Sequence, residues 1–344
     1  MESEVYMMTP DSYESWIFDE PVWKPNEVQK NKYYILSCSG GKDSTAMVLK
    51  FLDHNIYIDE IVYVDVGMEM PEMEEHIKKL KKYIKDDKAQ GSHIKFTRLK
   101  PKKGFRYWLG EHVKTRGKNK GKIGYGWPDH MNRWCTSQLK IQTLKKYYRK
   151  VLERECDPRL DYQDVEIVEF VGIAKNEKER AKKNDDDRIK EFNLIPFEMT
   201  EEDTLNYCYS KGFDWGGLYE KFGRVSCFCC PLSRLEELKY IYENYPELWL
   251  EMRMLDNMSF KGYKININYK KFKWFWRYYF THNYIFSLKP QIILKLLFEY
   301  EKEGRTFRSD YTLRELENKF TSEFYEELFG YEQTSFNFDL PRVS

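Results

Sequence analysis

The chain has 344 residues, of which 41% are hydrophobic and 33% are charged. This balance is typical of a globular protein and excludes a largely disordered one. The length suits a main domain with an accessory lobe. The 57 Lys and Arg residues nearly cancel the 56 Asp and Glu residues, so the net charge of +1 gives no indication of a nucleic-acid partner. Only local basic clusters could indicate one.

The sequence also bears on location. No apolar run reaches the length of about 18 residues that predicts a membrane-spanning helix. The acidic start, Met1 to Val5, has no apolar core of a secretory signal. We therefore expect a cytoplasmic protein with no membrane partner. Its seven cysteines, an odd number, then favour metal or thiol chemistry over disulfides.

Strand and helix signals alternate along the first part of the chain. One helix is predicted over 44–53 from its apolar faces, and another begins at Pro71, with acidic residues in its first turn. Because helix-sized spacings separate the strand signals, the pattern predicts a three-layer α/β fold with a parallel sheet of about five strands. Ligands of such sheets bind at the carboxyl ends of the strands. The apolar runs that predict strands are 33–38, 60–66, 94–99, 165–173 and 192–197.

Changes in composition divide the chain into four predicted parts. An arm with aromatic anchors is followed by an α/β nucleotide-binding domain, then by a lobe that carries a cysteine cluster, and last by a basic, aromatic and helical region. The predicted bounds of these parts are 1–30, 31–204, 205–260 and 261–344.

A Gly-rich run follows the first predicted strand and opens the first predicted helix. Its glycines let the backbone approach a phosphate and present N–H groups, its serines add hydroxyl donors, and Lys42 adds a charge. Because Asp43 would repel a bare phosphate, the run implies a Mg²⁺ ion or a nearby cation. An ordinary glycine-rich turn is the alternative, which this combination of residues disfavours. The run is Ser39-Gly40-Gly41-Lys42-Asp43-Ser44.

This run resembles the PP-loop signature of ATP pyrophosphatases, Ser-Gly-Gly-x-Asp-Ser. Members of that class cleave ATP between the α- and β-phosphates and adenylate a substrate oxygen, and a nitrogen or sulfur nucleophile then displaces AMP. Further segments are similar to elements of the phosphoadenosine phosphosulfate (PAPS) reductase family, although Ala174 stands where an Arg is usual. These segments are Asp65 to Glu72, Arg133 to Lys140, Gly172 to Arg180 and Ser226 to Pro231, and with the loop they cover about residues 33–235.

The resemblance implies an adenine nucleotide alpha-hydrolase-like fold and a set of residues that meet the nucleotide. ATP and Mg²⁺ would bind at Ser39–Ser44, with Lys42 and Asp43 acting in catalysis. Asp65 would lie near the adenine and ribose, and Gly172 and Arg180 would complete the nucleotide site.

A cysteine constellation accompanies these motifs. Cys227 and Cys230 form a Cys-x-x-Cys pair, and thiolates at this spacing can bind one soft metal with Cys135 as a third ligand. Three ligands suit a 4Fe-4S cluster with one open iron, and sulfur-inserting relatives of this loop class use such clusters, which implies that Cys135 belongs to the catalytic centre. A fourth ligand, Cys229, would suit zinc or a closed cluster, although its side chain should diverge from that of Cys230. Buried thiols are the plainer alternative, which we assign to Cys38 and Cys208.

Two features argue against sulfonucleotide reduction. The reductases of the family resemble one another in a Glu-Cys-Gly tail, whereas no cysteine follows Cys230 here. Those relatives also tend to have a degraded phosphate loop, and this loop is intact.

Two segments are rich in basic residues. Residues 95–122 contain eleven Lys or Arg residues and a single acid, Glu111, and residues 261–290 contain seven with no acid and eleven aromatic residues. Such segments could bind DNA or RNA through phosphates and stacked bases. The alternatives are a solvated basic face or a site for a triphosphate or a sulfonucleotide over 95–122, and an aromatic core over 261–290.

These observations favour an ATP-dependent sulfurtransferase that forms AMP and pyrophosphate. By pattern it is similar to DNA phosphorothioation and tRNA thiolation enzymes, with a sulfur donor such as a cysteine desulfurase. The runner-up is a sulfonucleotide (PAPS or adenylyl sulfate) reductase, an oxidoreductase, or a sulfate-adenylating enzyme of sulfur assimilation. A non-catalytic nucleotide-binding regulator or defence component is the third hypothesis. The acceptor, the donor and the oligomeric state, with a homodimer as one option, stay open.

Overall fold

The computed structural model describes residues 32–155, 166–177, 189–193, 198–225, 227–259, 307 and 311–329. The predicted arm over 1–30, Arg180 and the basic aromatic segment over 261–290 lie outside the described residues. No helix in the described ranges is both long enough and apolar enough to cross a membrane.

The chain forms two compact units, each made from separate stretches of sequence. The first unit comprises residues 1–104 and 135–227, and the second comprises residues 105–134 and 228–344. The four-part division expected from composition stays a prediction.

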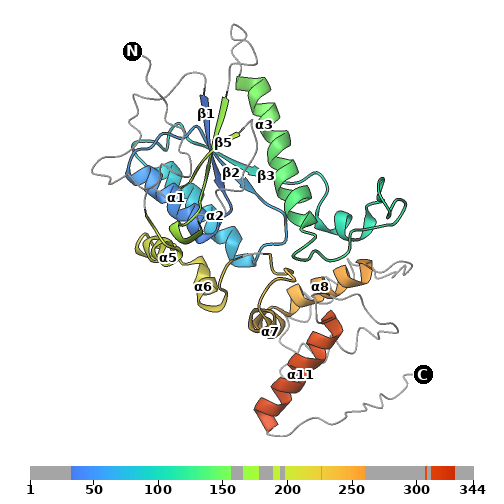
Figure 1. Ribbon diagram of the computed structural model, residues 1–344. Coiled ribbons are helices and arrows are strands. Elements are labelled where there is room, and N and C mark those ends of the chain that lie inside the picture. Colours follow the sequence, from blue (N-terminus) through green and yellow to red (C-terminus); the bar gives the residue numbers. More distant parts are fainter. Residues whose placement is uncertain are drawn as a thin grey trace, which may run out of the picture. The chain divides into compact units, whose positions relative to one another are not determined.

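The first unit is built around a parallel five-stranded sheet, which confirms the predicted fold class (Figure 1). The strand order is β3-β2-β1-β4-β5, and every neighbouring pair is parallel. The last strand begins three residues earlier than the predicted range of 192–197. Its register against β4 pairs Ile167 with Ile189 and Val171 with Asn193. The strands are β1 (Lys32–Cys38), β2 (Glu60–Val64), β3 (Lys95–Leu99), β4 (Glu166–Val171) and β5 (Ile189–Asn193).

Helices cover both faces of this sheet (Figure 1). On one face, Phe51 of helix α1 (Lys42–Asp53) lies 4.8 Å from Phe170, ring centre to ring centre. On the other, Tyr148 of α3 (Gln142–Glu155) packs on Ile35, Val62 and Ile167. Because successive strand residues point to opposite faces, both faces of the central strands are apolar, as a doubly covered sheet requires.

The strand order creates a switch point between β1 and β4. The chain moves outward from β1 through β2 to β3, with α1 and α2 (Pro71–Asp86) as the connections, and then returns to add β4 on the other side of β1. Because parallel crossovers are right-handed, α1 and α2 lie on one face of the sheet, and α3, which connects β3 to β4, lies on the other. The segments that follow β1 and β4 therefore diverge, and open sheets bind ligands in the crevice between such segments.

Short elements complete the first unit around this edge of the sheet. Those that contribute to the site are η4 (Thr136–Ile141), η6 (Lys175–Glu177), α5 (Glu201–Ser210), η8 (Trp215–Gly217) and α6 (Leu218–Lys221).

The second unit contains helices α7 (Leu235–Asn244), α8 (Pro246–Ser259) and α11 (Leu313–Phe329), together with the short helix η3 (Tyr107–Glu111). Trp249 of α8 is fully buried, and its ring lies 5.2 Å from Tyr242 of α7 and 5.9 Å from Phe320 of α11. These aromatic contacts form the core that joins the three helices.

Candidate functional site

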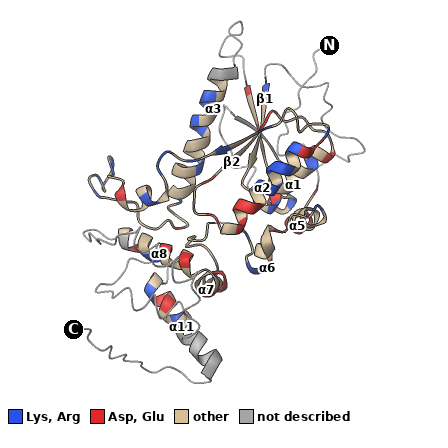
Figure 2. Cartoon of the chain, turned by 180° about the vertical axis from the view of Figure 1, so that it is seen from behind, with Lys and Arg blue, Asp and Glu red and all other residues tan. Residues whose placement is uncertain are grey.

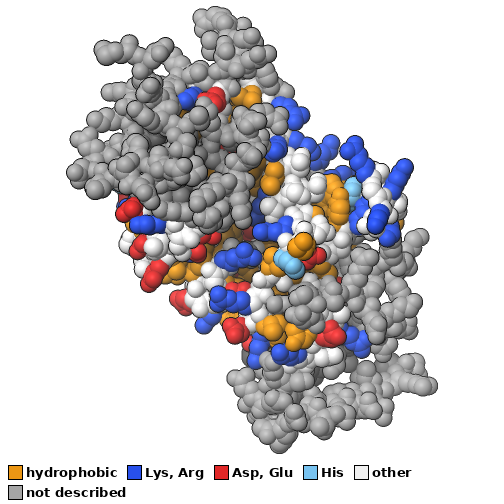
Figure 3. Space-filling model, viewed as in Figure 1, with side chains coloured by type: hydrophobic (Ala, Val, Ile, Leu, Met, Phe, Trp, Pro, Cys, Tyr) orange, Lys and Arg blue, Asp and Glu red, His pale blue; other side chains and the backbone are white. Residues whose placement is uncertain are grey.

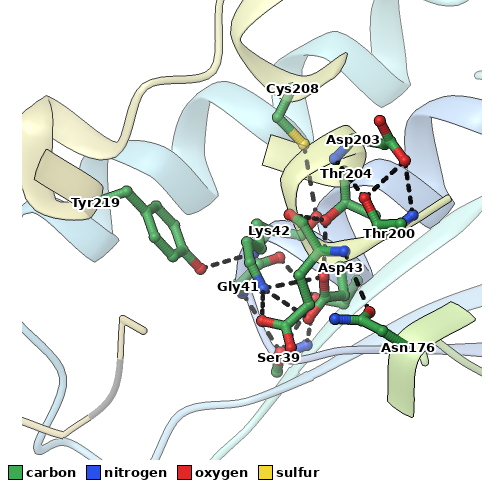
Figure 4. A network of polar contacts seen from close by, with 12 residues as sticks. Ser39, Gly41, Lys42, Asp43, Asn176, Thr200, Asp203, Thr204, Cys208 and Tyr219 are labelled. Carbon is green, nitrogen blue, oxygen red and sulfur yellow. Dashed lines mark hydrogen bonds and ion pairs between the residues drawn. The ribbon is translucent and has the colours of Figure 1, made fainter. Parts of the chain in front are cut away.

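The phosphate-loop motif lies at the switch point, between β1 and α1 (Figure 4). Gly41 is the N-cap residue of α1 and has no side chain that could accept a hydrogen bond from the first turn. The N–H groups of that turn are directed toward the loop. Gly40 has a φ of +77°, a backbone conformation that requires glycine, and it lies against the side chain of Met73.

The two serines of the loop have different roles. Ser44 is buried, and its hydroxyl accepts from Ser39 N and donates to Gly41 O, each at 3.1 Å. Ser44 therefore holds the loop in shape. Ser39 is exposed, so its hydroxyl is the one that a ligand can reach.

Lys42 is buried between carboxylates. Its Nζ lies 2.6 Å from Glu201 Oε2 and 3.3 Å from Asp43 Oδ1 (Figure 4). Thr204 also donates its hydroxyl hydrogen to Asp43, at 2.8 Å. Lys42 therefore supplies a cation beside Asp43, and a Mg²⁺ ion at this place stays a prediction. Glu201 was not predicted as a partner of Lys42. The one local signal beside it is the capping box of Thr200 and Asp203, which begins α5.

Two aromatic residues form hydrogen bonds with the backbone of the loop, and neither was predicted from the sequence. The indole of Trp215 donates to Gly40 O at 2.7 Å, and the hydroxyl of Tyr219 accepts from Lys42 N at 2.8 Å. The rings pack edge to face, with centres 4.8 Å apart. Burial raises the pKa of Tyr219, although backbone hydrogen bonds with Lys42 and Val225 lower it, so the phenol is neutral at pH 7.

His76 of α2 supports Trp215. The two rings stack with centres 4.6 Å apart and planes 20° apart, and His76 Nε2 lies 3.1 Å from Thr45 Oγ1. Burial, followed by repulsion from Lys79, lowers the pKa of His76 to about 4. His76 is therefore neutral at pH 7 and acts as a packing residue.

Gly172 follows β4 and lies against the start of α1. A Cβ on Gly172 would come within 2.9 Å of the backbone of Asp43 and Ser44. The structure thus brings Gly172 beside the loop, and close packing explains why glycine is needed there. Its role in the nucleotide site stays a prediction. Ala174, where the family pattern has Arg, is buried.

Asp65, which follows β2, is held by basic residues. Arg98 Nε lies 3.0 Å and Lys100 Nζ 3.3 Å from Asp65 Oδ2, and Gly67 N donates to Oδ1 at 2.8 Å. Burial alone would raise the pKa of Asp65, but these hydrogen bonds and charges outweigh it and lower the pKa below its usual value. Arg98 also pairs with Glu74, at 2.6 Å and 3.0 Å, and was not predicted from the sequence.

The cysteines fall into two groups. Cys38 and Cys208 are buried and burial raises the pKa of each thiol, which confirms their assignment to the core. In the first unit, Cys135 immediately precedes η4, and Cys227 forms an isolated antiparallel bridge with Glu69. Both are half-buried.

The other two motif cysteines belong to the second unit. Cys230 is half-buried and accepts a turn hydrogen bond from Ser233 N at 3.1 Å, whereas Cys229 is 1% exposed. Among the described residues, no group of three or more His, Cys, Asp or Glu side chains is placed to hold a metal ion. The predicted ligand set therefore stays a prediction, although half-buried thiols are chemically suited to it.

The family follows from a direct match. The family model of the phosphoadenosine phosphosulfate reductase domain matches residues 33–233. The chain belongs to this family. The matched range contains the phosphate loop, Asp65, Gly172 and all the motif cysteines.

Two uncharacterized proteins of Methanocaldococcus jannaschii are similar to this chain. MJ0066 is 29% identical over 229 residues, which are 63% of this chain and 40% of the relative. MJ0973 is 28% identical over 231 residues, which are 65% of this chain and 48% of the relative. The aligned region thus spans less than half the length of either relative.

Among solved structures, the U34-tRNA thiolase NcsA from Methanococcus maripaludis, with its 4Fe-4S cluster, is similar in 71% of this chain and 78% of its own. The sequence identity is 14% and the TM-score is 0.33.

Proposed function

We propose that this member of the PAPS reductase family is an ATP-dependent sulfurtransferase that adenylates an acceptor and releases pyrophosphate. The observation that carries the proposal is the phosphate loop, which stands at the switch point of the sheet with the first turn of α1 behind it. The exposed Ser39 hydroxyl and the first-turn N–H groups would bind phosphate oxygens. The same donors would stabilise the charge that develops when the α-phosphate is attacked.

The proposed chemistry has two steps. An acceptor oxygen attacks the α-phosphate of ATP, loses its proton to solvent and expels pyrophosphate. Sulfide, supplied by a donor such as a cysteine desulfurase with a thiol reductant, then attacks the atom that bears the adenylated oxygen. AMP leaves with that oxygen, and sulfur takes its place.

Two further groups are part of the proposal. Mg²⁺ would bind together with the triphosphate, and the carboxylate of Asp43, which pairs with Lys42 Nζ in this structure, is an oxygen donor of the kind that Mg²⁺ prefers. Cys135, Cys227 and Cys230 would hold a 4Fe-4S cluster, or zinc in the alternative, because each is a half-buried thiol while Cys229 is buried. When bound, a cluster with an open iron would supply a binding site for sulfide.

A titration with nucleotides tests the proposal. Calorimetry with α,β-methylene ATP, which cannot be cleaved at the relevant bond, should show one site per chain that ADP fills more weakly. Ser39→Ala should weaken binding, whereas Ser210→Ala, which removes an exposed hydroxyl at the end of α5, should leave it unchanged. Tighter binding of PAPS than of the ATP analogue would favour the sulfonucleotide alternative and contradict the proposal.

The metal content separates the remaining possibilities. Protein purified without oxygen should contain iron and acid-labile sulfide in matching amounts. Zinc without iron would indicate that the cysteines form a structural zinc site. The absence of both metals would contradict the proposed cluster.

A further inference from the structure

The second unit presents a basic arm, which we define as residues 112–126. Its two strands are joined by an antiparallel bridge between Val113 and Ile123, and Lys114 N donates to Lys122 O at 2.9 Å. The arm contains no Asp or Glu. Its cations are Lys114, Arg116, Lys118, Lys120 and Lys122.

The root of the arm is fixed. Gly124 has a φ of +68°, and a Cβ there would lie 2.2 Å from Leu109 O, so the backbone of the arm packs directly on η3. The indole of Trp134 donates to Gly126 O at 3.0 Å, and the indole of Trp127 donates to Asp256 of α8 at 2.7 Å. The arm is therefore attached to the core of its own unit by buried contacts.

The tip of the arm carries charge that is not neutralised locally. Arg116, Lys118, Lys120 and Lys122 are exposed, and no acidic side chain in the described ranges pairs with them. Figure 3 shows basic side chains gathered over this segment, which Figure 1 draws in teal, and Figure 2 shows the same basic character from behind. Like charges on facing strands repel one another, and a polyanion would relieve that repulsion.

The chemistry of the arm favours a nucleic acid over an acidic protein. Protein interfaces are depleted in lysine and depend on apolar anchors at their centres. Here the residues between the cations are Gly, Thr and Asn, which suit contacts to phosphate and sugar oxygens.

Aromatic rings stand at the root of the arm. The rings of His112 and Tyr125 stack with centres 5.2 Å apart and planes 19° apart, and Trp108 lies 4.5 Å from His112. All three side chains are half-buried, and Tyr125 also stacks on Trp134, with ring centres 5.9 Å apart, while Lys114 Nζ lies 5.3 Å from the centre of the Tyr125 ring. These ring contacts hold the root of the arm in place.

We propose that the basic arm binds the sugar-phosphate backbone of a nucleic acid, with the exposed cations of its tip contacting the phosphates. That this nucleic acid is the acceptor of sulfur rests on the proposed function. The binding itself does not, because the arm belongs to the second unit and needs no ATP.

The salt dependence of binding tests the arm directly. A labelled RNA stem-loop and a labelled DNA duplex are titrated without ATP, by fluorescence anisotropy, over a series of salt concentrations. The arm variant carries Arg116→Gln, Lys118→Gln and Lys120→Gln. The matched control carries Lys82→Gln, Lys85→Gln and Lys88→Gln, which remove the same charge from exposed positions on and just after α2.

Each lost phosphate contact should lower the slope of log affinity against log salt by about 0.7 for single strands and about 0.9 for duplex DNA. Three contacts then lower the slope by about 2 to 3, and weaken binding about 50- to 150-fold at 0.15 M salt. The control should keep the slope of the wild type. An equal loss in both variants, or no binding by the wild type at low salt, would overturn the proposal.

Two further measurements complete the test. Polyglutamate of equal charge should compete poorly with RNA, and equal competition would contradict a nucleic-acid partner. ATP-analogue binding by the arm variant should match the wild type, so a failure of the nucleotide site and a failure of the arm give different results.

Discussion

The Tyr219→Phe variant tests whether a bound phosphate accepts a hydrogen bond from the backbone N–H of Lys42. The substitution removes one oxygen from a side chain that is otherwise unchanged in shape. That oxygen accepts from Lys42 N at 2.8 Å, and Lys42 is 8% exposed. The N–H group at the start of α1 then has no protein acceptor and little access to water.

The cost of this change can be estimated. A buried donor left without an acceptor costs about 1 to 3 kcal/mol. For a unit of this size, each kcal/mol lowers the melting temperature by about 2 to 4 °C. If a phosphate oxygen accepts the hydrogen bond from Lys42 N in the nucleotide complex, the substitution destabilises the free protein but not the complex. Nucleotide affinity should then increase by about 5- to 150-fold, because each 1.4 kcal/mol corresponds to a factor of about ten.

Thermal unfolding and calorimetry with α,β-methylene ATP measure the two effects on the same samples. Tyr209→Phe is the matched control because it removes the same oxygen from another tyrosine beside Trp215. The ring of Tyr209 lies 6.5 Å from that of Trp215, and its side chain is 37% exposed. This control should change neither quantity. A destabilised Tyr219→Phe protein with unchanged or weaker nucleotide binding would refute the use of the Lys42 N–H by phosphate.

Three further predictions follow from the described contacts. Lys42→Ala leaves Asp43 and Glu201 without their shared cation and should abolish pyrophosphate release, so a wild-type rate would contradict the loop assignment. Gly172→Ala forces a Cβ to 2.9 Å from the backbone of α1 and should cost about 1 to 3 kcal/mol and weaken nucleotide binding, whereas Gly104→Ala, with open space around it, should not; urea unfolding and calorimetry compare them. Burial raises the pKa of Asp256 from its usual 3.8 to about 6, although the hydrogen bond from Trp127 opposes this shift. The protonated Asp256 carboxyl therefore contributes stability that is fully present below about pH 4 and is lost as the pH rises through 6. Asp256→Asn should therefore gain about 2 to 3 kcal/mol relative to the wild type between pH 4 and pH 7 in urea unfolding, and a constant difference would show that Asp256 does not titrate in this way.

The sequence alone determined the architecture of the first unit and the place of its loop. Alternating apolar runs and helix-sized spacings are local properties, and they predicted the parallel sheet, the start of α2 at Pro71 and the buried Cys38. The fifth strand was predicted at 192–197 but spans Ile189–Asn193, because its ends depend on pairing with β4. Gly172, which the family motifs assign to the nucleotide site, lies in the structure against the start of α1.

Only the tertiary structure decided which residues hold that loop. Tyr219 and Trp215 bond to residues about 175 positions earlier in the chain, and Glu201 reaches Lys42 across a similar separation. No periodicity or local motif encodes such partners, since they depend on how α5, η8 and α6 pack against the end of the sheet. The loop motif could therefore be identified from its own residues, whereas the contacts that set its shape and charge exist only in the folded chain.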